Sequence, residues 1–472
     1  MLFNSLEYAV FLCVVFLLFW GFVRLRLMRV LLLLAASYVF YMSWNATFIF
    51  LIVASTVIDY FIGLALGRTE HPGYRKALVG VSLLGNLGAL GLFKYADFFI
   101  AAASQGLSKV GVHTEPGMLN LVLPVGISFY TFQTLSYTID VYRRKIPPHH
   151  SFIEFATFVA FFPQLVAGPI VRASEFLPQF ANRPRLSSTR ASEGLFLIVV
   201  GLIKKVLVAD FLAANLIDRV FEEPGAFSST EVIVAVYAYS WQLYGDFSGY
   251  TDIARGSARL FGFDLPENFD RPYQCTGPID FWRRWHMTLS RWVQDYLYVP
   301  LGGSQISRGR TYVNLFITFF VIGIWHGAGW TFVIFGLWHA TGVAINRVYR
   351  DWRGERRREL TGWRRAAVVF VAFHFFVAQW PVFRSPTVTR MWEVYGQMFE
   401  GSLYPIRISP WVWLVIALAF IVHYTPKRWV GVVRDTLVRL PVVVQVVLIA
   451  AVTALITYVG RQQAAPFIYF QF

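Results

Sequence analysis

Apolar runs long enough to cross a membrane recur from one end of the chain to the other, and short basic stretches separate them. A helix of about 20 apolar residues spans the hydrocarbon core of a bilayer. The pattern therefore predicts an all-α polytopic membrane protein with about eleven transmembrane helices. The predicted spans are residues 6–23, 30–43, 48–66, 77–100, 119–142, 193–215 and 231–260, a hairpin of 316–325 and 332–345, and residues 366–383, 411–424 and 442–459.

The basic stretches predict the orientation of these spans, because cytoplasmic loops are enriched in Lys and Arg. Basic loops are predicted at 24–29, at 68–76, at 427–439 and, with the highest density of charge, at 346–365. If these loops are cytoplasmic, the alternation of spans places both the N-terminus and the C-terminus on the outer side of the membrane.

One apolar stretch, residues 152–170, interrupts this alternation. It contains FFPQLVAGPI, in which Pro163, Gly168 and Pro169 break a helix, and both of its flanks are basic. Irregular backbone at membrane depth is tolerated only where protein or a cavity covers it. We therefore expect a re-entrant or interfacial segment here.

Polar side chains inside the predicted spans are a second signal, because they are costly in lipid. Lys204 and Lys205 either snorkel to an interface, the more frequent case, or face a water-filled space. Asp246 and Asp252 are either a catalytic acid–base pair or ion-paired scaffolding with Arg255 or with Arg283 and Arg284, and the scaffolding is favoured. A polar interior is predicted beside the span 119–142, which carries Ser128, Tyr130, Gln133, Ser136 and Tyr137.

Composition supports the membrane assignment. Only 15% of the residues are charged and 56% are hydrophobic, unlike a soluble protein of 472 residues. The net charge of +15 lies in the loops, which favours anionic membrane lipids over nucleic acid as the partner. Cys13 and Cys275 are far apart and no His has metal-ligand spacing, so we expect neither a disulfide nor a metal site. No polar linker divides the chain, which predicts a single domain over residues 1–472.

The stretch from Asp280 to Val299 carries the first candidate histidine. Read as one helix, it has an apolar stripe rich in Trp and Tyr opposed by Arg, which is typical of a helix lying in the membrane interface. His286 lies at the edge of this stripe, beside Trp282 and Trp285. It is either a local hydrogen-bonding residue or part of a functional site.

His326 is the stronger candidate. It follows the apolar run 316–325 and precedes the glycine-containing stretch 327–329. An intramembrane His normally faces a cavity, a partner or a substrate path, although a packing role is the alternative. Burial disfavours the imidazolium ion, so His326 is expected to be neutral at pH 7 and able to accept a proton.

Several long stretches form an ordered set along the chain: PVGISFYTFQTLSYTIDVYR, FFPQLVAGPI, YGDFSGYTDIA, PENFDRPY, DFWRRWHMTLSRWVQDYLYVPLGG, NLFITFFVIGIWHGAGWTFVIFGLWH and the terminal FIYFQF. In this set the chain resembles the membrane-bound O-acyltransferase superfamily. The branch it resembles most is the bacterial alginate O-acetyltransferase type, and the D-alanyl transfer protein of teichoic acid modification is a relative.

The resemblance implies a helical bundle around a central catalytic channel, where a cytoplasmic and an outer funnel meet. It implies that His326, in WHG, is the intramembrane catalytic histidine and that His286, in RRWH, is the second histidine. It further implies an enzyme of the bacterial inner membrane with acetyl-CoA as cytoplasmic donor and no permanently bound cofactor. The acetyl group would reach an exported polysaccharide such as alginate directly or through a periplasmic partner protein.

The chemistry expected of the residues agrees with this. Acyl transfer from a thioester requires the acceptor hydroxyl to lose its proton as it attacks, and His326 as general base supplies that. His286, beside Arg283 and Arg284, would orient the donor or stabilise developing negative charge. The basic cytoplasmic face would attract the phosphates of the donor. The remaining residues predicted to contact substrate are Gln294, Tyr298, Asn314 and Trp325.

Two other readings stay open at this stage. One is D-alanyl transfer or acylation of a membrane lipid, which uses the same chemistry. The other is a transporter without chemistry of its own. The lack of an internal repeat counts against it, and so does the position of His286 and His326, each directly after a Trp. The sequence does not indicate the oligomeric state.

Overall fold

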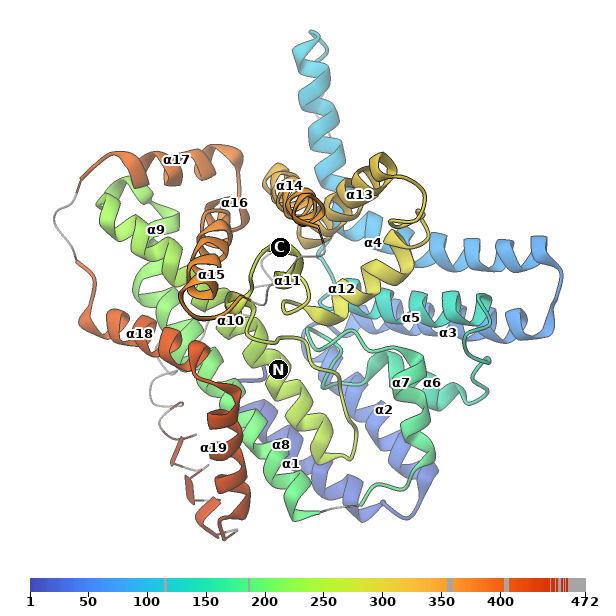
Figure 1. Cartoon of the computed structure of the whole chain (residues 1–472). Coiled ribbons are helices and arrows are strands. Elements are labelled where there is room, and N and C mark those ends of the chain that lie inside the picture. Colours follow the sequence, from blue (N-terminus) through green and yellow to red (C-terminus); the bar gives the residue numbers. More distant parts are fainter. Residues whose placement is uncertain are drawn as a thin grey trace. The chain divides into compact units, whose positions relative to one another are not determined.

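The computed structural model describes residues 1–113, 117–185, 187–354, 360–402 and 407–441, with 443–445, 447–448, 451–452, 454 and 456 (Figure 1). Throughout this part of the chain the secondary structure is helical and contains no strand. The chain divides into two compact units, Met1–Leu186 with Ser257–Leu265, and Ser187–Gly256 with Pro266–Phe472. The single domain expected from the sequence stays a prediction.

The all-α membrane fold predicted from the hydrophobic pattern is confirmed. Within the described residues, three helical stretches are long and apolar enough to cross a membrane: Ala46–Arg68, Pro72–Lys109 and Gly362–Arg384. Leu6–Gly21 and Pro410–Tyr424 are shorter apolar helices. The count of about eleven spans stays a prediction, and half of the last expected span, 442–459, lies outside the described residues.

The first unit is built mainly from its five longest helices, α1 to α5. Its helices are α1 (Leu6–Gly21), α2 (Arg26–Met42), η1 (Ala46–Phe48), α3 (Ile49–Arg68), α4 (Pro72–Lys109), α5 (Ile127–Tyr142), α6 (Phe152–Ala160), α7 (Ala173–Phe176) and η2 (Leu177–Ala181).

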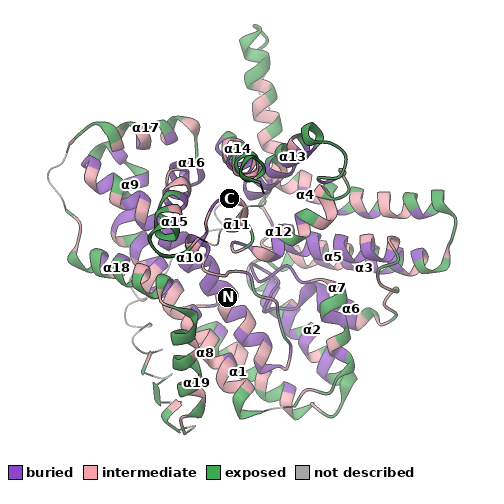
Figure 2. Cartoon of the chain, viewed as in Figure 1, coloured by how far each residue is buried: buried purple, intermediate pink, exposed green. Residues whose placement is uncertain are grey.

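A buried carboxylate joins three of these helices. Asp59 of α3 accepts hydrogen bonds from Ser82 and Asn86 of α4 and from Thr138 of α5, the last two at 2.7 and 2.8 Å. Buried polar groups are stable when such donors satisfy them. The prediction of a polar interior beside α5 agrees with this cluster, and all five polar residues named for that span are buried (Figure 2).

The irregular stretch predicted within 152–170 is also present. Helix α6 ends at Ala160, and the backbone that follows, up to Val171, is not helical and is buried throughout. Protein therefore covers this irregular backbone, as the membrane environment requires.

The second unit holds every residue proposed for the site. Its helices are α8 (Ser188–Leu202), the π-helices η3 (Ile203–Asp210) and η4 (Ala213–Ile217), α9 (Asp218–Glu222), η5 (Pro224–Ala226), α10 (Ser229–Leu260, which carries the unit boundary), η6 (Pro272–Gln274), α11 (Pro278–Phe281), α12 (Met287–Val293), the π-helix η7 (Gln294–Tyr298), α13 (Arg308–His326), α14 (Trp330–Arg353), α15 (Gly362–Val377), α16 (Trp380–Arg384), α17 (Val388–Phe399), α18 (Pro410–Tyr424) and α19 (Lys427–Arg439).

Two expectations about this unit were wrong in detail. Residues 427–439 were read as a basic loop but form the helix α19. The single interfacial helix expected from Asp280 to Val299 is divided into α11, α12 and η7. The break falls at His286, whose φ of 41° is left-handed and cannot continue a right-handed helix.

Helices α13 and α14 form the predicted hairpin and lie side by side (Figure 1). They approach closely at two glycines. A Cβ atom on Gly323 would lie 2.4 Å from the carbonyl oxygen of Phe332, and one on Gly336 would lie 2.5 Å from that of Phe319. Glycines at a helix interface permit this close backbone approach inside a membrane.

A network of buried charges joins the π-helix η3 to α10. Lys205 Nζ lies 2.7 Å from Asp210 Oδ1 and 2.8 Å from Asp246 Oδ1, and the Lys205 side chain is only 5% exposed. Snorkelling to an interface is therefore the wrong explanation for Lys205. Its neighbour Lys204 pairs with Asp252 at 2.6 Å.

The ion-paired role predicted for the two aspartates of α10 is confirmed, with partly different partners. Arg255 lies 3.9 Å from Asp252, as one of the expected pairings. Arg284 instead pairs with Asp280 at 2.9 Å. The other cations that pair with these aspartates are the two lysines of η3. Their position beside α10 is set by the fold.

Gly336→Ala tests the close approach of α13 and α14. A Cβ there meets backbone atoms that no side-chain rotation can move, so we expect a loss of about 1 to 3 kcal/mol of stability. Gly396→Ala is the control, because nothing lies within 4 Å of a Cβ at that position of α17. There, replacing a helical Gly should stabilise by up to about 1 kcal/mol. Thermal unfolding of the detergent-purified protein measures both, and equal shifts would contradict this packing.

Lys205→Met tests the buried charge network. It leaves two carboxylates buried without their cation, which typically costs about 3 to 5 kcal/mol. Lys204→Met is the matched neighbour, since the Lys204 side chain is 28% exposed and water can replace part of its interaction. We expect Lys205→Met to lower the unfolding temperature more than Lys204→Met, and the reverse order would overturn the assignment.

Candidate functional site

His326 ends helix α13, where the hairpin turns toward α14. It is buried, and the rings of Phe335 and Phe383 approach it nearly edge-on, each with its centroid 5.3 Å away. The turn that follows needs Gly327, because a Cβ there would lie 2.0 Å from the ring of Phe332. The sequence therefore places one imidazole at a fixed point inside an aromatic enclosure.

His286 is held by a different device. Its left-handed backbone precedes α12, and the loop residue Asn268 satisfies the start of that helix. Asn268 Oδ1 accepts from the Thr288 backbone N–H at 3.2 Å and from its hydroxyl at 2.9 Å, and the Asn268 carbonyl accepts from the Met287 N–H at 3.0 Å. The loop thus acts as an N-cap supplied from outside the helix.

The side chain of His286 is fully buried, and the residue lies outside the candidate membrane spans. Phe247 of α10 meets its ring edge-on at a centroid distance of 4.7 Å. Burial lowers the pKa of His286 to about 3, because the charged form loses its hydration. His286 is therefore a neutral imidazole at physiological pH.

Trp325 connects the two histidines. Its ring centroid lies 4.9 Å from that of His326 and 5.7 Å from that of His286. The structure thus brings together the two histidines and the tryptophan predicted for the site, although they come from separate helices. Both imidazoles therefore contact the same indole.

A small cavity adjoins His326. Its volume is about 10 Å³, near the least space that one water molecule needs. The walls are apolar and aromatic apart from a few groups, and no acidic residue lines them. The lining residues are Leu243, Phe281, Trp282, Trp285, His326, Phe335, His339, Gln379, Trp380 and Phe383.

His339 of α14 is a wall residue that the sequence analysis did not single out. It is buried, and its ring centroid lies 4.5 Å from that of Phe335, which also packs on His326. The available signal was a second Trp-His pair, Trp338-His339, in the same motif as Trp325-His326. Gln379 was also missed, since nothing in the local sequence marks it.

The other residues predicted to contact substrate differ in their exposure and in their hydrogen bonds. Arg283 and Gln294 are exposed. Arg284 donates to Asp280 and to the Asp270 carbonyl. None of these three lines the cavity beside His326. A role of their side chains in binding the donor stays a prediction.

Tyr298 of η7 and Asn314 of α13 both bond to the turn between these two helices. The buried amide of Asn314 donates to the carbonyls of Leu301 and Gly303, at 3.1 and 2.9 Å. The carbonyl of Tyr298 accepts from the N–H of Gly303 at 2.9 Å. These bonds hold the turn, and contact of either residue with substrate stays a prediction.

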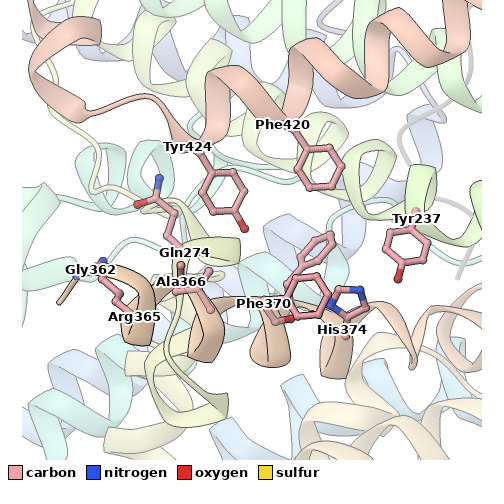
Figure 3. Close-up of a pocket in the computed structure, with 11 residues that line it drawn as sticks. Tyr237, Gln274, Gly362, Arg365, Ala366, Phe370, His374, Phe420 and Tyr424 are labelled. Carbon is pink, nitrogen blue, oxygen red and sulfur yellow. The ribbon is translucent and has the colours of Figure 1, made fainter. Parts of the chain in front are cut away.

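A separate groove of about 580 Å³ lies between α15 and α18 in the same unit. Figure 3 shows Phe420 and Tyr424 projecting into it from α18, opposite Phe370 and His374 of α15. Its lining includes neither of the two predicted catalytic histidines. The groove therefore offers apolar surface rather than the chemistry of the site.

Comparison with known proteins bears on what this arrangement does. The model of MBOAT, the membrane-bound O-acyltransferase family, matches residues 141–383. A probable alginate O-acetylase of Pseudomonas aeruginosa is 39% identical over 376 residues, covering 79% of this chain and 70% of the relative. Another, from Pseudomonas putida, is 36% identical over 474 residues, 94% of each chain. The peptidoglycan O-acetyltransferase of Helicobacter pylori is 38% identical over 343 residues, 67% of this chain and 64% of its own.

Asn268→Ala tests how His286 is positioned. It removes the cap of α12, typically a loss of about 0.5 to 2 kcal/mol, so hydrogen exchange of the α12 amides should accelerate. Ser307→Ala is the matched control, because Ser307 caps α13 through the Arg310 N–H and does not touch α12. For Ser307→Ala, hydrogen-exchange mass spectrometry should show faster exchange at the start of α13 and unchanged exchange in α12. Unchanged α12 exchange in Asn268→Ala would contradict the cap.

Proposed function

Because the chain belongs to the membrane-bound O-acyltransferase family, we propose that it moves acetyl groups from cytoplasmic acetyl-CoA across the bacterial inner membrane, for O-acetylation of an exported polysaccharide such as alginate. The chain is an O-acyltransferase, and its fold is that of a membrane protein. The acetyl group is favoured as cargo because the alginate and peptidoglycan relatives both carry O-acetyl transfer in their names.

The observation that carries the proposal is the aromatic enclosure of His326 beside a small cavity. In the transfer step, the acceptor hydroxyl oxygen attacks the thioester carbonyl carbon while His326 takes the hydroxyl proton. The new C–O bond forms, the C–S bond breaks, and the imidazolium returns the proton to the leaving thiolate of CoA. A base within hydrogen-bond reach typically contributes about 10² to 10⁴-fold.

His286 acts as a positioning residue in this proposal. Its imidazole packs against the indole of Trp325, which also packs against the imidazole of His326. Removing its ring leaves a void behind Trp325 and lets the indole and His326 shift. Small displacements of a catalytic base weaken catalysis because they disturb the attack geometry.

The charge of the loops supports the cellular setting that we propose. The basic loops face the cytoplasm, where they attract the phosphates of the donor, and both termini are periplasmic. The acceptor is a sugar hydroxyl of the exported polymer or of a periplasmic partner that carries the acetyl group onward. Transfer of D-alanyl or a lipid acyl group uses the same base, and mass spectrometry of the modified polymer separates these products.

His326→Ala is the direct test in cells that lack the native gene. We expect polymer-bound acetate to fall by at least about 10²-fold, because the base is gone. His286→Ala should give a smaller loss. His374→Ala is the matched control, since His374 lines the groove of Figure 3 and not the cavity, and it should retain acetate.

The measurement is acetate released by mild base from purified polymer, normalised to the membrane level of each variant. Wild-type acetate in cells that contain His326→Ala at normal levels would overturn the proposed function. Loss of acetate in His374→Ala as well would show that the readout reports damage to the fold.

A further inference from the structure

A hydrogen bond in the cavity wall determines which ring nitrogen of His339 carries the proton. Trp282 Nε1 donates to His339 Nδ1 at 3.3 Å. An indole N–H can only donate, so Nδ1 must be an unprotonated acceptor. His339 is therefore the neutral tautomer that carries its proton on Nε2, the nitrogen on the far side of the ring.

Gln379 lies on the same wall, immediately before α16. It is 0% exposed, it lines the cavity with His326 and His339, its side chain interacts with that of His339, and its amide nitrogen makes no hydrogen bond within the described residues. An unsatisfied buried amide typically costs about 1 to 3 kcal/mol. A side chain kept in this state beside a reactive histidine points to a ligand that satisfies it.

The neighbouring side chains determine whether this wall presents hydrogen-bond donors or acceptors to the cavity. If the Nε2–H of His339 donates to the Gln379 oxygen, the Gln379 NH₂ is left to donate into the cavity. If it does not, the Nε2–H itself is the donor there. In either case this wall offers N–H donors to a ligand, while His326 offers a proton acceptor.

We propose that His339 and Gln379 form the oxyanion-binding site of the enzyme, holding the carbonyl oxygen of the acyl group while His326 takes the acceptor proton. This rests on the proposed acyl transfer. The attack turns the thioester carbonyl into a tetrahedral intermediate whose oxygen carries negative charge. When the intermediate collapses, that oxygen re-forms the carbonyl of the new ester, the C–S bond breaks, and the negative charge leaves on the thiolate, which takes the proton from the His326 imidazolium. The donors of His339 and Gln379 neither gain nor lose a proton.

The size and polarity of the cavity fit this role. Its volume of about 10 Å³ accommodates one oxygen-sized group rather than a cofactor. Its lining contains no acidic residue that would repel an oxyanion. Donors fixed in a site that excludes water stabilise developing charge strongly, because no reorganisation is needed during the reaction. A neutral imidazole can serve as such a hydrogen-bond donor to a developing oxyanion.

The test uses inverted membrane vesicles that contain the full chain and the polymer-modifying proteins of the host, with labelled acetyl-CoA as donor. We expect Gln379→Leu to lower kcat by about 10² to 10³-fold with KM for acetyl-CoA near wild type, as for loss of an oxyanion donor. Gln274→Leu is the matched control, since that amide donates to the His423 carbonyl at 2.6 Å, away from the cavity. It should retain kcat.

Substitutions at His339 separate donation from packing. His339→Gln places an amide N–H near the position of Nε2 and should keep much of kcat, whereas His339→Leu should lose it. Trp282→Phe should lower kcat in the wild type, because both tautomers of His339 then become accessible. In the His339→Gln background it should have little further effect, a non-additivity that a general packing defect does not produce.

Wild-type kcat in Gln379→Leu and in His339→Leu, with His326→Ala inactive, would overturn the oxyanion site and leave the proposed function standing. Full activity of His326→Ala would instead remove the proposed function itself. If His339→Leu does not reach the membrane, Gln379→Leu and the pair of Trp282 variants decide the question.

Discussion

The site depends on how closely α13 and α14 approach one another. Gly323 and Gly336 let the two helices meet backbone to backbone, with less than 3 Å between a Cβ placed on either glycine and a carbonyl oxygen of the other helix. That contact fixes the end of α13, and so His326, against the face of α14 that carries Phe335 and His339. A wider separation would leave room for water between the imidazoles and would weaken every electrostatic interaction in the cavity.

Buried charges in the second unit have their own partners. Lys205, Asp210 and Asp246 form one such network, in which each charge has a close partner of opposite sign. The cavity beside His326 is lined by neutral groups only. Proton transfer there is accordingly governed by imidazoles and amides, whose donor and acceptor roles are set by individual hydrogen bonds such as that from Trp282 to His339.

Much of this arrangement could be predicted from the sequence. The 316–345 hairpin, the prominence of His326 and the irregular stretch after Ala160 each follow from local patterns of apolar, glycine and proline residues. The break at His286 could not be predicted, because it depends on Asn268, distant in the chain, capping α12. Likewise, the pairing of Lys205 with Asp246 and the neighbourhood of His339 and Gln379 are set by tertiary contacts. A wall residue such as Gln379 has no distinguishing local context, so only the fold reveals it.

The central claim is that acyl transfer takes place at the His326 cavity. The most direct measurement is an electron cryomicroscopy structure of the protein with a non-reactive thioether analogue of acetyl-CoA. We expect the carbon atom of the analogue that replaces the carbonyl carbon to lie close to the His326 ring. An acceptor oxygen hydrogen-bonded to that ring would then lie about 3 to 4 Å from this carbon. An analogue whose acyl end lies in the groove between α15 and α18, or anywhere else away from His326, would contradict it.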